Sequence, residues 1–494
     1  MRDAINRFDV IDSSEIMTSK SLSLRDPDGQ LHLHNERIIR WVRKDKKPEF
    51  DQFLASDFAK SQVGAGSLIR TDALSESDAA GTELRLTGPN LASEAIDGGL
   101  YEHERVEFIS YPYEWPAEMC QQAAALTLDL SSEAMAAGYR LKDATPYNVL
   151  FRGPKPVFVD VLSFEQRQPG DPLWPAEGQF LRMFLLPLLA EKWFGLSCAD
   201  LLAQHRDGIQ PDLIYRLYQK PALLSPFALR YVALPVWLAA KSDDPAFYER
   251  QLLDNVDQAD FIYQRVLRRL RRALAVVAPK REGRSHWSGY MADHSYSDQA
   301  FKQKEAFVAQ ALEKFRPSLV LDIGANTGHF SFLAAERGAS VVSLDSDAKS
   351  VGAIWQQAQK NGLDVLPLIQ NIADPRPSLG WRNAETSSFL ERARGKFDLV
   401  LMLALIHHLM LTNGIPIEEI VDLAAEISDG LCIIEYVGAS DAMRQRLRRG
   451  RMEIDGAITK ERFEAACAKW FRTHVVEQVA GSDRWLYLLE RNDT

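Results

Sequence analysis

The sequence predicts an α/β protein in which a doubly wound parallel sheet follows an α+β domain. Two observations predict the sheet. A short apolar strand, Leu319–Leu321, runs through a glycine-rich turn into a helix, and further apolar segments follow at intervals typical of strands joined by helices. A third observation, paired short strands separated by turn residues, predicts the α+β domain. We expect these domains at residues 1–280 and 287–494, with a linker around Gly283.

The first domain contains signals for hairpins and long helices. Turn residues at 27–29 separate two strand-like segments, residues 21–26 and 31–42, which indicates a hairpin. Apolar residues recur with helical spacing from Pro116 to Gly138, and a second hairpin with a GPKP turn follows. Residues 172–275 are predicted to be mostly helical.

The glycine-rich turn of the second domain predicts a ligand site. Asp322 ends the strand, and Gly324 and Gly328 bracket the turn. Glycine permits positive φ angles and a close approach of ligand to backbone. The helix expected at Phe330–Glu336 offers free N–H groups at its start. Because Asn326 lies inside a D-x-G-x-x-x-G spacing, the turn does not match the G-x-G-x-x-G fingerprint of dinucleotide sites.

Acidic and apolar segments continue the pattern after this turn. The next strand ends in Asp345, whose carboxylate can accept both hydroxyl groups of a ribose. The remaining strands are expected within residues 366–375, 396–409, 431–437 and 484–491.

This order of segments resembles the class I methyltransferases that use S-adenosylmethionine, over roughly residues 287–494. The resemblance implies that the loop after the third strand flanks the adenine of the cofactor. Asn371 stands there in place of the commoner aspartate, and an amide can still bind adenine. The alternative is an α/β domain whose glycines only form a tight turn. The implied cofactor residues are Asp322, Gly324, Asn326, Gly328, Asp345, Asn371 and Ile372.

Candidate groups for the methyl transfer follow the fourth and fifth strands. His407 and His408 come directly after the fourth strand, and Glu435 ends the fifth. Any of them could serve as the general base that a hydroxyl acceptor needs. The alternatives are one packed and one exposed helical histidine, and a hydrogen-bonded carboxylate at a strand end.

Two further groups flank this region. Aromatic residues before the first helix predict either a lid over the cofactor or ordinary packing. An arginine cluster after the fifth strand could bind an anionic acceptor, but a solvent-exposed helix face is the favoured interpretation. The two groups are Tyr290, His294 and Tyr296, and Arg444, Arg446, Arg448, Arg449 and Arg451.

A second constellation lies in the first domain. Asn148 follows Asp143 by five residues, and Asp160 comes after the second hairpin. In phosphoryl transfer, the first aspartate orients the acceptor hydroxyl, and the asparagine and second aspartate hold a metal ion. The segment resembles the catalytic loop and metal-binding segment of protein kinases and aminoglycoside phosphotransferases, with residues 111–115 as the interlobe hinge. A glycine-rich phosphate loop and a strand lysine are not evident. An active kinase with ATP and Mg²⁺, a degenerate kinase fold and an unrelated domain therefore remain open.

Composition limits the class of protein. The chain has 494 residues, too many for one ordinary core, and a net charge of −10, which argues against a nonspecific nucleic-acid binder. Its four cysteines lack metal-binding spacing and indicate a reducing compartment. The most apolar segment, residues 180–196, is interrupted by charged residues and by proline, so no membrane span is expected and a cytoplasmic location is predicted.

The two halves together resemble a bacterial family of nodulation-type methyltransferases, through the segments KDATPYN, FVDVLSFE and IHHL. We predict an S-adenosylmethionine-dependent methyltransferase that acts on a small-molecule or saccharide acceptor and carries a kinase-like accessory domain. One alternative is a bifunctional kinase–methyltransferase. The other is a noncatalytic scaffold that binds the cofactor.

Overall fold

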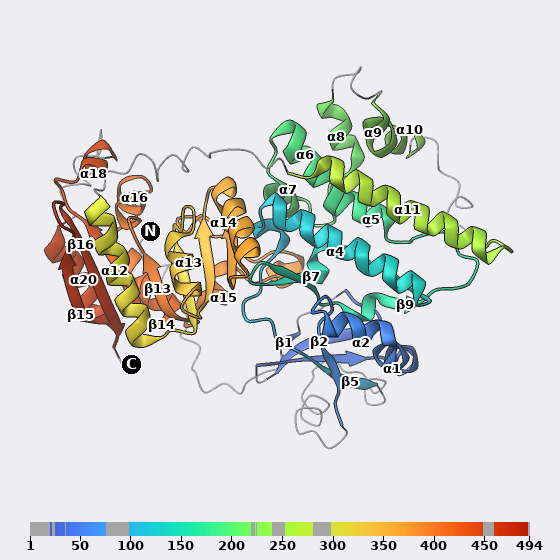
Figure 1. Cartoon of the computed structure of the whole chain (residues 1–494), viewed down its shortest axis with the longest axis horizontal. Coiled ribbons are helices and arrows are strands. Elements are labelled where there is room, and N and C mark those ends of the chain that lie inside the picture. The colour runs from blue at the N-terminus through green and yellow to red at the C-terminus, as the bar shows by residue number, and fades with distance from the viewer. Residues whose placement is uncertain are drawn as a thin grey trace, which may run out of the picture. The chain divides into compact units, whose positions relative to one another are not determined.

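The computed structural model divides into two compact units. Figure 1 labels its helices and strands. The first unit comprises Met1–Arg105, Ala134–Arg140 and Val159–Arg167, and the second comprises Val106–Glu133, Leu141–Phe158 and Gln168–Thr494. The described residues are 20–21, 25–34, 36–75, 98–218, 223, 225–239, 252–279, 298–447 and 459–492. The predicted domain boundary and several predicted residues lie outside them, namely Gly283, Tyr290, His294, Tyr296, Arg448, Arg449 and Arg451.

The first unit is built on an antiparallel sheet with the strand order β1-β2-β3-β5-β4. The predicted hairpin at residues 27–29 is confirmed, because Lys20 of β1 pairs with Leu33 of β2. The strand candidate at residues 37–42 is confirmed as β3, which pairs with β2 across a turn at Glu36, where φ is 64°. The elements are β1 (Lys20–Ser21), β2 (Gly29–His34), β3 (Arg37–Val42), α1 (Lys47–Ala55), α2 (Asp57–Gly64), β4 (Thr71–Ala73) and β5 (Gly99–His103).

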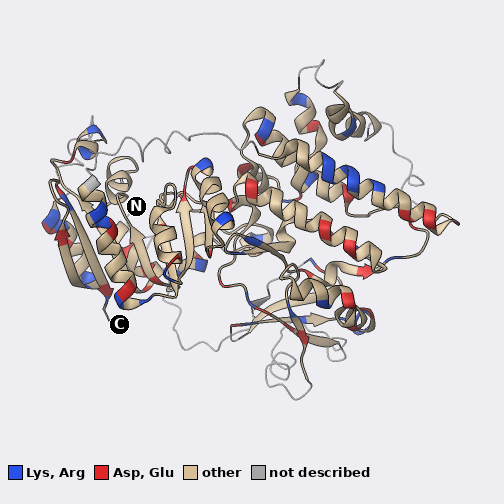
Figure 2. Cartoon of the chain, viewed as in Figure 1, with Lys and Arg blue, Asp and Glu red and all other residues tan. Residues whose placement is uncertain are grey.

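The second unit begins with helices and a small hairpin, as the sequence predicts. The long helix α4 (Ala117–Ala136) is followed by the hairpin β7 (Val149–Arg152) and β8 (Lys155–Phe158). Figure 2 shows basic residues along α11 (Val256–Val277), and one of them, Arg269, donates to Glu177 at 2.6 Å. The other helices are α5 (Glu177–Phe180), α6 (Leu186–Phe194), α7 (Cys198–Gln204), α8 (Pro211–Leu217), α9 (Pro226–Ala228) and α10 (Leu234–Ala239).

The carboxy-terminal part of the second unit contains a seven-stranded sheet with the order β12-β11-β10-β13-β14-β16-β15. Neighbouring strands from β12 to β14 are parallel, and β16 is antiparallel to both β14 and β15. The strands are β10 (Leu319–Ile323), β11 (Ser340–Asp345), β12 (Val365–Ile369), β13 (Phe397–Met402), β14 (Ser428–Val437), β15 (Phe471–Gln478) and β16 (Arg484–Arg491).

Helices join these strands, which confirms the predicted doubly wound α/β class. Every residue of β10 is buried, so helices cover both faces of the sheet at its centre. The helices are α12 (Asp298–Phe315), α13 (His329–Ala335), α14 (Ala348–Asn361), α15 (Phe389–Ala393), α16 (Ile406–Leu411), α17 (Ile417–Ile427), α18 (Ala442–Leu447) and α20 (Lys460–Trp470). Of the described helices, none combines the length and apolar character needed to cross a membrane.

Sequence reasoning missed β15. This strand lies at the edge of the sheet, pairs with β16 alone, and buries few of its side chains. Its sequence, FRTHVVEQ, therefore lacks the apolar run that marked the central strands.

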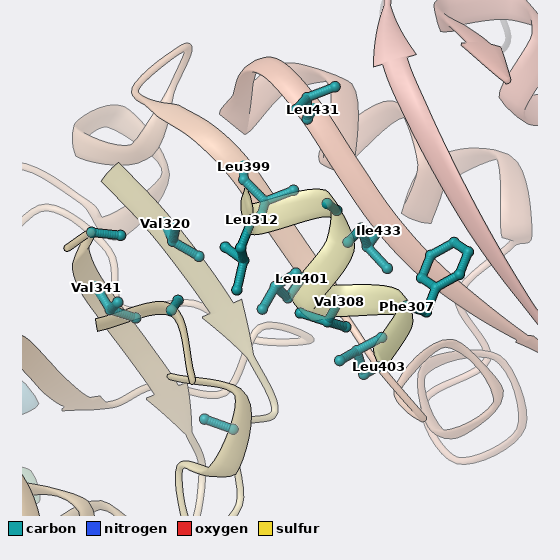
Figure 3. Packing of buried hydrophobic residues seen from close by; sticks show 14 of the residues in the cluster. Phe307, Val308, Leu312, Val320, Val341, Leu399, Leu401, Leu403, Leu431 and Ile433 are labelled. Carbon is teal, nitrogen blue, oxygen red and sulfur yellow. The ribbon is translucent and has the colours of Figure 1, made fainter. Parts of the chain in front are cut away.

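The core of the sheet forms where α12 packs across it (Figure 3). Val308 and Leu312 lie one helical turn apart and are fully or almost fully buried, with Phe307 beside them. They pack with Val320 of β10 and Leu401 of β13, among other strand residues. This apolar contact fixes α12 against the strands whose ends carry the candidate site.

The segment predicted as an interlobe hinge packs against an edge of this sheet. The short helix η2 (Pro112–Glu114) contacts β12, the edge strand. Tyr113 Oη donates to Thr386 Oγ1 at 2.9 Å, and Arg392 forms a buried ion pair with Glu114. Covering an edge strand in this way prevents it from pairing with another chain.

We expect Leu312→Ala to lower the free energy of unfolding by about 2–5 kcal/mol, because it removes buried methyl groups and leaves a cavity. Chemical denaturation of the full chain measures the loss. The control is Lys314→Ala on the exposed side of the same helix, which should change stability by about 0.5 kcal/mol or less. Equal effects of the two substitutions would contradict the packing described for α12.

Candidate functional site

The candidate site lies where β10, β11 and β12 end at the same edge of the sheet. The turn after β10 is fixed to the end of β11, because the backbone N–H groups of Gly324 and Ala325 both donate to Leu344 O, at 2.8 and 2.9 Å. This edge is where ligands bind in open α/β sheets.

The two glycines of the turn are needed for different reasons. Both have positive φ angles, 77° at Gly324 and 84° at Gly328. Gly324 is exposed, and a Cβ atom there would meet only Leu405, at 3.4 Å, so its surface is open to a ligand. A Cβ atom at Gly328 would come within 2.9 Å of Ile354, so this glycine allows α13 to begin close to α14.

Asp322 is buried beneath the turn in a chain of hydroxyl groups. Ser331 Oγ donates to Asp322 Oδ2 at 2.6 Å, and Ser343 Oγ donates to Ser331 Oγ at 2.7 Å. Burial raises the pKa of Asp322 to about 6, and the nearby charge of Lys304 opposes that rise. The pKa of Asp322 therefore lies close to neutral pH.

Asp345 is oriented by backbone donors. The N–H groups of Asn326 and Asp347 donate to its two carboxylate oxygens at 2.8 and 2.9 Å. A carboxylate has about four acceptor positions, and the backbone of Ser346 also bonds to this carboxylate, so acceptor capacity remains for a ligand hydroxyl such as that of ribose. Burial raises the pKa of Asp345. The side-chain oxygen of Asn326 is buried without a hydrogen-bond partner among the described residues.

The loop after β12 contains the two predicted adenine residues and one that was missed. Asn371 is exposed, and its side-chain oxygen accepts from Ala373 N at 3.1 Å, while Ile372 is buried. The missed residue is Gln370, whose N–H donates to Asp345 O at 2.8 Å. Its buried amide has no side-chain partner among the described residues. A single glutamine in a loop gives no sequence signal.

The predicted histidines, His407 and His408, lie in the first turn of α16, which begins four residues after the end of β13. Their rings are 4.4 Å apart between centroids. His407 is 1% exposed, and neither ring nitrogen has a hydrogen-bond partner in the described part of the chain. Burial lowers the pKa of His407 well below its ordinary value and also lowers the pKa of His408. Both rings are therefore neutral at pH 7.

Glu435 is fully buried and is contacted by two cations. Lys304 Nζ donates to one carboxylate oxygen at 2.6 Å, and Arg484 Nη1 donates to the other at 3.2 Å. Sequence reasoning missed both cations, because Lys304 is on the helix before the first strand and Arg484 starts the last one.

The arginine cluster after β14 was interpreted as a solvent-exposed helix face, and this interpretation is wrong for Arg444. This residue is buried, and its guanidinium donates to Val437 O at 2.8 Å and to Tyr436 Oη at 3.4 Å. Arg446 is exposed, as that interpretation predicted. Burial of Arg444 follows from the turn after β14, which directs the start of α18 back towards the strand end.

The residues of the second constellation are divided between the two units. Asp143 and Asn148 belong to the second unit, and Asp160 belongs to the first. Arg40 of β3 donates to Asp160 Oδ1 at 3.0 Å, and Ser163 also donates to this carboxylate. Among the described residues, no three His, Cys, Asp or Glu side chains form a metal site. The roles proposed for Asp143, Asn148 and Asp160 therefore stay predictions.

The fold and this site define a class of protein. Residues 296–479 match the family model described as a methyltransferase domain. The chain carries a methyltransferase domain over these residues and is an enzyme of that class, as the resemblance to class I methyltransferases predicted.

Over almost its whole length, the chain is similar to a nodulation protein, NoeA, of Rhizobium meliloti (strain 1021). The two are 29% identical over 481 residues, which cover 95% of this chain and 96% of that protein. Solved structures with a similar part include WbdD, at 18% identity and a TM-score of 0.29, where the match covers 40% of this chain and 42% of WbdD. Another is the N-methyltransferase NodS of Bradyrhizobium japonicum WM9, at 13% identity and a TM-score of 0.30, with coverage of 40% and 99%.

The residues at this edge fit the cofactor. Gly324 offers an open backbone surface, and Asp345 retains acceptor capacity. The buried, unpartnered oxygen of Asn326 is a group that a ligand donor can satisfy.

We expect Asp322→Asn to stabilise the protein at neutral and higher pH. The pKa of Asp322 is raised from 3.8 to about 6 in the folded state. Its contribution to stability is therefore fully present below about pH 4 and is lost as pH rises through about 6, a loss of about 3 kcal/mol. Denaturation from pH 4 to 8 should show the variant more stable than the parent at pH 8 and similar at pH 4. Asp429→Asn, at an exposed position, is the control; a variant no more stable at pH 8 than this control would refute the assignment.

We expect Asp345→Ala to weaken S-adenosylmethionine binding by about 1–3 kcal/mol, because the ribose hydroxyls lose their acceptor. Gly324→Val should weaken binding too, since valine resists a φ of 77° and covers the open surface. Calorimetry measures both. Asp364→Asn, at the amino end of β12, is the control and should bind normally. Unchanged affinity in folded Asp345→Ala would disprove the ribose assignment.

Proposed function

We propose that this methyltransferase acts on a hydroxyl group of a small-molecule or saccharide acceptor, with His407 as the general base. One observation carries the proposal. A neutral, buried imidazole whose nitrogens lack partners among the described residues lies two residues after Leu405, which faces the open surface of Gly324. An unsatisfied polar group of this kind costs about 1–3 kcal/mol, which a functional role explains.

The cofactor residues proposed are those of the three strand ends. Asp345 would accept the ribose hydroxyls, the turn from Asp322 to Gly328 would lie under the methionine part, and the loop at Asn371 and Ile372 would flank the adenine. When bound, S-adenosylmethionine supplies a methyl group on a sulfonium sulfur, which keeps the electron pair of the broken bond.

His407 has the protonation state that a base requires. Burial and the nearby arginines lower its pKa, so a ring nitrogen has a free lone pair at neutral pH. The acceptor oxygen would gain the methyl group and lose its proton to this nitrogen. Placing the base within hydrogen-bond reach of the hydroxyl contributes about 10²–10⁴-fold to such a step.

The acceptor class follows from charge. The net charge of −10 favours a neutral small molecule or saccharide over nucleic acid. The buried Arg444 is already engaged with Val437 and Tyr436, which further favours an acceptor without a strong negative charge.

For the amino-terminal half we propose a kinase-like accessory domain without phosphoryl transfer. Asp160 would have to bind the metal of a nucleotide, yet its carboxylate accepts from the guanidinium of Arg40 and from Ser163. Arg40 in turn donates to Asp26 at 3.0 Å and to His103 at 3.1 Å, so it is held in place. A fixed cation beside Asp160 does not fit a Mg²⁺ ligand, because like charges repel.

We expect His407→Asn to lower methyl transfer by about 10²–10⁴-fold while S-adenosylmethionine affinity is kept, because a base acts mainly in the transition state. Transfer of labelled methyl groups to components of a cell extract measures turnover, and calorimetry measures affinity. The exposed His205→Asn is the control for histidine loss. If His408→Asn or Glu435→Gln abolishes transfer and His407→Asn does not, His407 is not the base.

A further inference from the structure

Three arginines on α11 have no acidic partner in the described part of the chain. Arg265, Arg268 and Arg272 follow one another at intervals of three and four residues, so they lie on one face of the helix. All three are exposed, and none forms an ion pair with another described residue. We call these three residues the arginine row. In a chain whose net charge is −10, they form a local surface that attracts anions.

The acids of the neighbouring helices are paired with the other two arginines of α11. Arg269 donates to Glu177 of α5 at 2.6 Å, and Arg271 forms an ion pair with Asp129 of α4. These contacts attach α11 to α4 and α5 through one side of the helix. The arginine row is therefore left facing solvent without a compensating charge.

Exposed apolar side chains lie on the helices that pack beside α11. Lys192 of α6 donates to Val276 O of α11 at 2.7 Å, which places the end of α6 beside the end of α11. Contacts join α6 to α8 and α8 to α10, and Tyr231, just before α10, hydrogen-bonds to Arg269. The exposed apolar residues, which we call the apolar patch, are Trp193, Leu196, Leu217, Leu234, Trp237 and Leu238, each at least 37% exposed.

The two tryptophans of the apolar patch are held by neighbouring aromatic residues. The ring of Trp193 contacts the ring of Phe227 edge to face, with centroids 5.2 Å apart, and Trp237 Nε1 donates to Tyr215 Oη at 3.2 Å. Both tryptophan side chains nevertheless remain 42% exposed. Exposed apolar patches of this kind mark surfaces that contact a protein or a membrane.

The helix α11 itself carries exposed apolar residues on both sides of the arginine row. Phe261 lies one turn before Arg265 and is 55% exposed, and Val276 lies one turn after Arg272 and is 45% exposed. Asp257 lies one turn before Phe261, so the face changes sign at the start of the helix. Arginine next to exposed aromatic and aliphatic side chains is typical of helices that lie at the boundary between lipid headgroups and acyl chains.

We propose that the arginine row and the apolar patch bind the surface of an anionic lipid bilayer. The guanidinium groups would contact lipid phosphates, and the tryptophan and leucine side chains would enter the headgroup boundary. A closed dimer uses the same surface on both copies, which would bring two arginine rows together. Nucleic acid would engage the arginine row and leave the apolar patch exposed. The bilayer surface satisfies both features.

The first test is co-sedimentation of the full chain with vesicles. We expect binding to phosphatidylcholine vesicles enriched in phosphatidylglycerol, weaker binding to phosphatidylcholine alone, and loss of binding as the salt concentration rises. The triple variant Arg265→Gln, Arg268→Gln, Arg272→Gln should weaken binding to the anionic vesicles by about 100-fold, at roughly fivefold per arginine.

The matched control makes the same change in net charge elsewhere. The triple variant Arg43→Gln, Arg394→Gln, Arg472→Gln removes three exposed arginines that each pair with an acid, and it should bind like the parent. The affinity for S-adenosylmethionine, measured by calorimetry, should be unchanged in both triple variants, which shows that each is folded.

The second test concerns the apolar patch. Bromine on the acyl chains quenches a tryptophan that enters the bilayer, so binding should quench part of the parent's fluorescence. The quenched fraction should fall in the double variant Trp193→Phe, Trp237→Phe. Leu238→Ser, at a position that is 60% exposed, should weaken vesicle binding severalfold. Val475→Ser on β15, 43% exposed, is the control and should bind normally.

Three results would overturn the proposal. They are no binding to anionic vesicles at low salt, equal binding by the two arginine triple variants, and an unchanged quenched fraction in the tryptophan double variant. Sedimentation equilibrium examines the competing occupant. A dimer of the parent that dissociates in Leu238→Ser, with no vesicle binding, would assign this surface to a second copy of the chain instead.

Discussion

The negatively charged carboxylate of Glu435, near the end of β14, is fully buried. A buried carboxylate is tolerated only when cations and hydrogen bonds replace water, and here Lys304 and Arg484 do so from opposite ends of the domain sequence. The arrangement requires α12 to lie across the sheet and β16 to lie beside β14. The position of β16 beside β14 and the apolar packing of α12 therefore bring both cations to Glu435.

The cofactor side of the edge follows a different physical rule. Its groups are oriented by backbone N–H donors and hydroxyls rather than by opposite charges, as at Asp345 and Asp322. Several polar atoms remain buried without partners among the described residues, including the Asn326 oxygen, the Gln370 amide and the His407 nitrogens. Such groups lower stability and are characteristic of sites in which a ligand completes the hydrogen bonding.

The amino-terminal part of the second unit packs against an edge of the seven-stranded sheet. Residues 109–114 contact the segment that follows the loop after β12, through Tyr111 with Ser387, Tyr113 with Thr386 and Glu114 with Arg392. Trp355 Nε1 also donates to Pro154 O at 3.0 Å. A segment that resembles an interlobe hinge thus serves to cover an edge strand.

Four features of the carboxy-terminal half could be predicted from the sequence alone. They are the order of the strands along the chain, the glycine-rich turn, the acidic residue at the end of β11 and the two histidines after β13. Each of these features depends on residues within a few positions of each other. Hydrophobic periodicity, the need for glycine at positive φ and the residue type at a strand end can therefore be recognised in a short stretch of sequence. The tertiary structure alone decided that Arg444 is buried, that Glu435 is clamped, and that Gln370 lies beside Asp345. These contacts join residues up to 131 positions apart, as Lys304 and Glu435 are, and no local pattern encodes such a pairing. The edge strand β15 was missed because it has no apolar pattern of its own. Its hydrogen bonds to β16 define it as a strand.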